Sequence, residues 1–225
     1  MTELTPIARV QMVDAVVEQI RQQIVEGKLG RGKRVPPELE LAERLSVSRN
    51  TVREAMRILE AEGWVQRSKR GTTVIEKDAN LLAAPLANLA RLEGIDAHQL
   101  FEVRLVIEAE MAAMAAARAT ERDRARVSEA LAHLEADQTQ EGFLNANFDF
   151  HRAIAIGSGN QVLMAILDAI KTHLLTEQFA GPADVQTRKA SNEGHREIAK
   201  AILTADVEGA RQAMRQHLKA IEDRY

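Results

Sequence analysis

The chain has 225 residues, of which 45% are hydrophobic and 28% are charged, and its formal net charge is -3. It contains no cysteine, which excludes disulfides and thiolate metal sites, and no apolar run approaches the roughly 20 residues that a membrane span requires. We therefore expect a cytoplasmic protein with no membrane partner and enough residues for two domains.

The charge is distributed unevenly along the chain. Residues 1–77 carry 14 Lys and Arg against 11 Asp and Glu, a balance of +3, whereas residues 78–225 carry 16 against 22, a balance of -6. The basic part is N-terminal, and DNA is polyanionic, so this part is the candidate DNA-binding domain. Aromatic residues make up only 3% of the chain, too few for the stacking platforms of single-strand binders. A protein that reads duplex DNA would not need such platforms.

The first domain, residues 1–77, is predicted to contain three helices and a β-hairpin. Apolar spacing and helix-ending glycines place the helices at 9–26, 38–45 and 49–62. Ser48 is a suitable N-cap for the third helix, and the basic, proline-containing segment 30–37 is expected to be a loop. Two β-prone stretches, 64–67 and 72–75, flank a basic turn. Together these elements predict a winged helix-turn-helix.

The third predicted helix carries the residues that would read DNA. Its apolar residues share one face, which leaves Arg49, Asn50 and Arg53 available on the other. A short-turn helix pair with arginines in the first turns of its second member fits a helix that enters the major groove by its N-terminal end. The turn of the hairpin adds Lys69, Arg70 and Gly71. The alternative is that these charges form an ordinary solvated helix face.

The second domain, residues 78–225, is rich in alanine and leucine with helical spacing and shows no strand pattern. It is predicted to be an all-α antiparallel bundle of about seven helices, which makes the fold class mainly α. The helices are expected at residues 79–93, 97–119, 121–138, 141–157, 160–179, 185–204 and 206–223.

Four side chains of this domain form a candidate metal site. Asn147 and His151 are four residues apart and share one helix face, whereas His195 and His217 lie on two later helices that a bundle could bring to the same point. Imidazole nitrogen is a good ligand for zinc or nickel, the two divalent ions we expect most. By spacing alone, ordinary core or surface histidines remain an alternative.

Arg104 lies within an apolar helix, where a charge requires a partner. Two partners are open at this point. One is Glu108, one helical turn along. The other, implied by the family resemblance described next, is the carboxylate of a small effector bound beside the metal.

The run from Val35 to Ala55, VPPELELAERLSVSRNTVREA, resembles the N-terminal domain of GntR-family regulators. Three further segments resemble the FadR-type branch of this family, whose C-terminal ligand-binding domain is called FCD: Phe101-Glu102-Val103-Arg104, Phe150-His151 and Gly159-Asn160. The resemblance implies a homodimer bound to an operator, with DNA contacts from Arg49, Thr51, Arg53 and the wing tip around Gly71. It also implies a metal held by the Asn147, His151, His195 and His217 positions.

Two positions depart from the family pattern. The second helix commonly has an arginine where this chain has Leu39, so one expected DNA contact is absent here. FCD domains commonly have an aspartate where this chain has Asn147. An amide oxygen can coordinate but carries no charge, so a divalent ion should be held less tightly than in an aspartate version.

These features predict a ligand-responsive repressor rather than an enzyme. It would bind a pseudo-palindromic operator as a homodimer and respond to a small carboxylate or sugar acid at a metal-assisted pocket. One alternative is a regulator that senses the metal itself. Another is a metallohydrolase, but the sequence offers no carboxylate general base near His151, His195 or His217.

Overall fold

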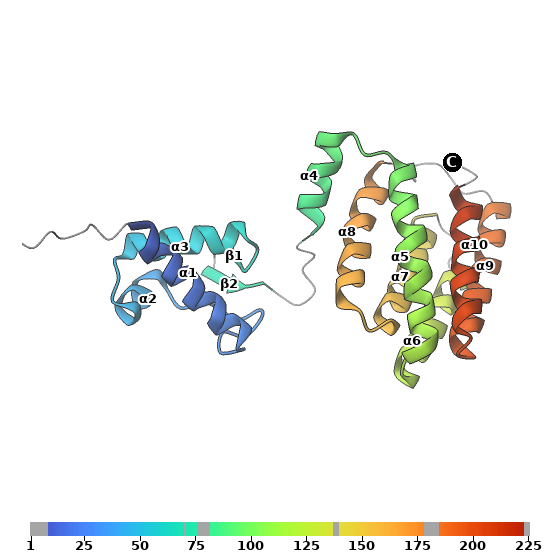
Figure 1. Ribbon diagram of the computed structural model, residues 1–225, viewed down its shortest axis with the longest axis horizontal. Coiled ribbons are helices and arrows are strands. Elements are labelled where there is room, and N and C mark those ends of the chain that lie inside the picture. Colours follow the sequence, from blue (N-terminus) through green and yellow to red (C-terminus); the bar gives the residue numbers. More distant parts are fainter. Residues whose placement is uncertain (1–8, 70, 76–81, 137–139, 178–184, 223–225) are drawn as a thin grey trace, which may run out of the picture. The chain divides into compact units, whose positions relative to one another are not determined.

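The computed structural model describes residues 9–69, 71–75, 82–136, 140–177 and 185–222 (Figure 1). The chain divides into two compact units, residues 1–79 and residues 80–225, and each is considered by itself. In the described part of the chain, no helix is both long and apolar enough to cross a membrane.

The first unit is a three-helix domain with a hairpin. Its helices are α1 (Arg9–Val25), α2 (Glu38–Leu45) and α3 (Arg49–Ala61), and its strands are β1 (Val65–Ser68) and β2 (Gly71–Val74). The two strands pair antiparallel, with Val65 opposite Val74, and both of these valines are buried. The expected winged helix-turn-helix is therefore confirmed.

The turn between α2 and α3 is set by two serines. Ser46 ends α2 in the left-handed conformation, at φ 54°, and Ser48 caps α3 by accepting a hydrogen bond from the Thr51 backbone N–H at 3.1 Å. The turn fixes which face of α3 is buried. Val52, Ala55 and Leu59 have no exposed surface and lie in the core shared with α1 and α2. The opposite face of α3 is left for solvent or a partner.

The segment before α2 is a loop, as expected, and it also pairs with the wing. Arg34 forms a β-bridge with Thr73, the Val35 N–H donates to the Thr72 carbonyl at 2.9 Å, and the Val74 N–H donates to the Lys33 carbonyl at 2.9 Å. Its prolines and glycines hid this pairing, because they occupy positions on either side of the paired residues. The pairing fastens the hairpin to the start of α2.

The second unit is a bundle in which the described residues form the seven expected helices (Figure 1). Apart from shifts of a few residues at their ends, the helices lie where the sequence predicts. They are α4 (Ala83–Glu93), α5 (Ala97–Arg118), α6 (Glu121–Ala136), α7 (Gln140–Gly157), α8 (Gln161–Glu177), α9 (Val185–Leu203) and α10 (Val207–Glu222).

Helix α5 runs through the bundle and packs against α7, α8, α9 and α10. Its small residues allow this close packing: Ala109, Ala112 and Ala115 have no exposed surface. The larger core side chains come from the neighbouring helices, among them Phe150 of α7 and Met214 of α10. This alanine-lined helix explains why polar groups on α5 lie deep inside the unit.

Arg124 of α6 joins the ends of two helices. Its guanidinium donates to the carbonyls of Ile202 and Leu203 at 2.7 and 2.8 Å, at the end of α9, and to the carbonyls of Ala116 and Ala119 at 3.4 and 3.3 Å, at the end of α5. Helix ends leave carbonyls without intrahelical partners, and a cation there also interacts favourably with the helix dipole.

Replacing Arg124 with alanine should therefore destabilise the helical unit. Hydrogen bonds from a charged group typically contribute about 1.5–3 kcal/mol, so the free energy of unfolding in urea should fall by about that amount. Arg122→Ala, which removes the same charge from an exposed position of α6, is the matched control and should change it by less than about 0.5 kcal/mol. Equal effects of the two variants would contradict the capping role.

Candidate functional site

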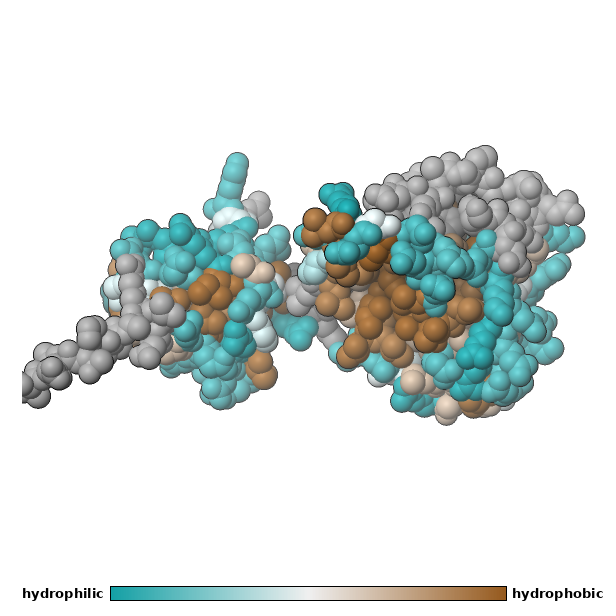
Figure 2. All heavy atoms as spheres, turned by 45° about the horizontal axis from the view of Figure 1, so that its top comes forward, coloured by the Kyte–Doolittle hydropathy of each residue, from teal (hydrophilic) through white to brown (hydrophobic). Residues whose placement is uncertain are grey.

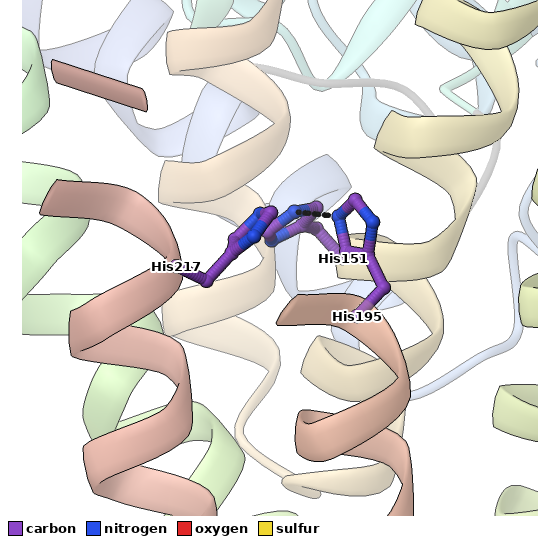
Figure 3. A group of neighbouring side chains, drawn as sticks. All are labelled: His151, His195 and His217. Carbon is purple, nitrogen blue, oxygen red and sulfur yellow. Dashed lines mark hydrogen bonds between the residues drawn. The ribbon is translucent and has the colours of Figure 1, made fainter. Parts of the chain in front are cut away.

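Three histidines from three helices meet inside the helical unit (Figure 3). His151 comes from α7, His195 from α9 and His217 from α10, and their side chains point toward one another. One ring nitrogen from each lies within 4.8 Å of the others. All three are buried, with 2%, 0% and 5% of their surface exposed.

The arrangement of the imidazoles fits a divalent metal. The Nε2 atoms of His151 and His195 are 3.4 Å apart, longer than an ordinary hydrogen bond between nitrogens. Two ligands of a tetrahedral zinc ion, each about 2.0–2.1 Å from the metal, would lie roughly 3.3–3.4 Å apart. In the described part of the unit, Nε2 of His217 is buried without a hydrogen-bond partner. Buried polar atoms rarely lack partners, so this nitrogen points to an additional group.

A buried glutamate orients His151. Glu108 of α5 accepts a hydrogen bond from Nε of Arg104 at 2.5 Å, and its other oxygen is hydrogen-bonded to Nδ1 of His151. Burial by itself would raise the Glu108 pKa, but the charge of Arg104 and the hydrogen bonds with Arg104 and His151 outweigh it and lower that pKa to about 2. A charged Glu108 assigns the proton to Nδ1 of His151, which leaves Nε2 to bind a metal.

The other two imidazoles are held neutral. Burial, and next the neighbouring histidines, keep the pKa values of His195 and His217 well below the ordinary value for histidine. Metal binding requires an unprotonated nitrogen, so neutral rings are ready for an ion at neutral pH without first losing a proton.

The structure pairs Arg104 with Glu108, the first of the two partners that the sequence left open. This pair uses Nε, and among the described side chains no partner holds the terminal nitrogens, so a contact between Arg104 and an effector stays a prediction. Asn147 lies on α7 one turn before His151 and is half-buried. Its role as a fourth ligand also stays a prediction.

Two contributors to this site were missed from sequence. One is the bond between Glu108 and His151, because nothing in the sequence brings α5 beside α7. The other is Gly194, where an added Cβ would lie 2.7 Å from Nδ1 of His217. A glycine inside a helix, directly before a candidate ligand, is the signal that could have found it. Gly194 allows α9 to approach His217 closely.

The predicted DNA-reading residues of α3 differ in accessibility. Arg49 and Asn50 are exposed and Arg53 is partly exposed. Thr51 is only 6% exposed, and its hydroxyl lies 2.8 Å from that of Ser48, so it supports the start of α3 in this conformation. The DNA contacts of all four residues remain predictions.

The tip of the wing is described in part. Lys69 and Gly71 are exposed, and Gly71 has φ 119°, a conformation that side chains disfavour. Arg70 lies outside the described residues. Leu39, at the position where the family commonly has arginine, is 58% exposed on α2. An apolar side chain therefore occupies the surface of α2 at this position.

Comparisons with known proteins agree with both units. The family described as bacterial regulatory proteins, gntR family, matches residues 12–75, and the FCD domain matches residues 99–220. The chain is 32% identical over 208 residues to the HTH-type transcriptional regulator LutR of Bacillus subtilis, covering 89% of this chain and 94% of that protein. It is 30% identical over 226 residues to the HTH-type transcriptional repressor NanR of Cronobacter sakazakii, covering 96% and 86%.

A solved structure extends this similarity to three dimensions. The Streptococcus agalactiae GntR structure is 28% identical and has a TM-score of 0.75, covering 95% of this chain and 100% of that one. These relatives are regulators rather than enzymes, which excludes the metallohydrolase alternative. The chain belongs to the GntR family of transcriptional regulators, in the FadR-type branch that carries a C-terminal FCD domain.

Proposed function

We propose that this regulator is a homodimeric cytoplasmic repressor whose affinity for a pseudo-palindromic operator is set by a small carboxylate or sugar acid bound beside a metal in the helical unit. The observation that carries the proposal is the meeting of three buried imidazoles inside the domain that matches FCD. Repression is supported by the relative named as a repressor, NanR.

In this proposal the metal is held by His151, His195 and His217, with Asn147 as the fourth ligand. When bound, a zinc or nickel ion supplies a positive centre that attracts carboxylate oxygens. Glu108 keeps Nε2 of His151 available, and it also offsets the charge of Arg104. The ligands are neutral, so the bound ion keeps its full charge for the effector.

The effector would act through linkage between its site and the operator. A ligand can shift operator affinity only if it binds one arrangement of the two DNA-binding units better than another. A carboxylate that reaches the terminal nitrogens of Arg104 would share that guanidinium with Glu108, which is bonded to Nε. Because Glu108 also bonds His151, Arg104 and Glu108 connect the effector to a metal ligand.

The alternative of a metal-responsive regulator uses the same three histidines. The two are separated by one observation: in a metal sensor, chelation alone changes operator affinity, whereas in the proposed function the metal-loaded protein still needs the carboxylate. The uncharged Asn147 favours a regulator that responds to a small carboxylate over one that responds to the metal. A metal site that lacks an Asp or Glu ligand holds metal less tightly.

Dimerisation is supported by an apolar face on the helical unit, which Figure 2 shows as a brown area. Exposed large apolar residues on three helices, α4, α5 and α8, are Leu89, Leu92, Val103, Val106 and Val162. Monomeric soluble proteins rarely leave such a group uncovered. A second copy of the chain is the proposed occupant, because a pseudo-palindromic operator requires two identical DNA-binding units.

Zinc should stabilise the wild-type chain through the three histidines. At 100 times its dissociation constant a ligand adds about 2.7 kcal/mol, so the melting temperature should rise by several degrees. His195→Gln and His217→Gln should lose most of this rise. His98→Gln, which changes an exposed histidine, is the control and should keep it. An undiminished rise in both site variants would contradict the metal assignment.

Arg53→Ala should weaken binding to the operator by about 10-fold to 100-fold in a gel-shift assay, because a lost arginine–guanine pair costs about 1–3 kcal/mol. Arg122→Ala removes the same charge from the helical unit and should leave operator affinity unchanged. Unchanged operator affinity in Arg53→Ala would show that α3 is not the recognition helix.

Val106→Lys should convert the dimer to a monomer, because a charge would be buried at the proposed interface. Sedimentation velocity measures the result directly. Val25→Lys alters an equally apolar and exposed residue of α1, and this variant should stay dimeric. If Val106→Lys sediments as the wild-type dimer, the α4, α5 and α8 face is not the interface.

A further inference from the structure

We infer that Glu38 is a positioning residue for DNA reading: it holds the arginines of the recognition surface so that they favour operator bases over the phosphates of any duplex. The inference rests on the DNA-binding role of the first unit. It concerns how well the protein discriminates between sequences.

Glu38 lies at the start of α2, where three arginines from two other elements converge on its carboxylate. Its Oε2 is 3.7 Å from Nε of Arg49 and 3.5 Å from Nε of Arg53, both on α3. Its Oε1 is 3.7 Å from a terminal nitrogen of Arg67, on β1. One carboxylate therefore links the second helix, the recognition helix and the wing.

Arg49 and Arg53 face Glu38 through Nε. Among the described residues no partner holds their terminal nitrogens, so these nitrogens are available to a base edge. Guanine offers two acceptors, O6 and N7, that match such nitrogens. Arg67 is also paired with Glu60 at 3.2 Å and donates to the Arg53 carbonyl at 3.4 Å. It therefore supports Arg53 from the side of the wing.

The ion pairs between Glu38 and the arginines are long and exposed. The side chain of Arg49 is 60% exposed and that of Arg53 is 42% exposed, and none of the three distances to Glu38 is below 3.5 Å. Exposed pairs of this kind are weak, so they limit the movement of the two arginines without preventing their contacts with DNA. Without the carboxylate, both arginines would be free to follow phosphates on any sequence. Glu38 therefore disfavours non-specific binding more than operator binding.

The test compares two glutamates in the first turn of α2. The full-length wild-type chain first selects an operator from a pool of randomised duplexes, and fluorescence anisotropy then gives affinities for that operator and for the unselected pool. Glu38→Gln keeps the size of the side chain and removes its charge. It should bind the random pool about threefold to tenfold more tightly without a matching gain for the operator, so the ratio of the two affinities falls.

Glu40→Gln is the matched control, because Glu40 is paired with Arg44 and makes no contact with Arg49 or Arg53 in the described residues. It should leave the affinity ratio unchanged. The effect of Glu38→Gln on random-duplex affinity should also shrink in a chain that carries Arg49→Ala and Arg53→Ala. Circular dichroism melting checks that the variants fold.

Two results would overturn the inference: an unchanged ratio in Glu38→Gln, or equal changes in Glu38→Gln and Glu40→Gln, which would reduce the effect to net charge. Both results can be told apart from a failure of the chain to bind an operator at all. If the wild-type chain enriches no sequence from the pool, operator binding itself is contradicted, and the ratio cannot be formed for any variant.

Discussion

The buried carboxylate of Glu108 is the interaction on which the helical unit depends. A charge inside a protein is tolerated only when it is paired and hydrogen-bonded, and removing one partner of a buried pair typically costs about 3–5 kcal/mol. Glu108 meets this requirement through Arg104 on its own helix and His151 on α7. The bond to His151 joins α5 to α7 and sets the free nitrogen of that imidazole. The bond between Glu108 and His151 therefore both joins the two helices and prepares His151 to bind a metal.

The two units use charged side chains in comparable ways. In the helical unit, Glu108 holds an arginine and a histidine in a buried site, where the bonds are short. In the DNA-binding unit, Glu38 faces Arg49 and Arg53 at a surface, where the pairs are loose. The difference follows from burial, because water weakens the exposed pairs. Only the pairs at the surface leave their arginines accessible to DNA.

Local patterns predicted the fold well and the site in part. The N-cap at Ser48, the seven helices of the bundle and the hairpin follow from spacing and capping within short windows. The pairing of Arg34 with Thr73, the bond from Glu108 to His151 and the convergence of arginines on Glu38 join segments distant in sequence. Spacing along one element carries no information on such pairs. The three histidines were predicted because the family resemblance supplied the missing long-range information.

The central claim is that a small carboxylate bound beside the three-histidine site changes operator affinity. The most direct test is the operator dissociation constant of the zinc-loaded dimer with and without a saturating small carboxylate whose binding is established by calorimetry. The account predicts a change of about 5-fold to 150-fold, and the operator should alter affinity for the carboxylate by the same factor. Equal operator affinity in the two states, with the carboxylate bound in both the free and the operator-bound protein, would contradict it.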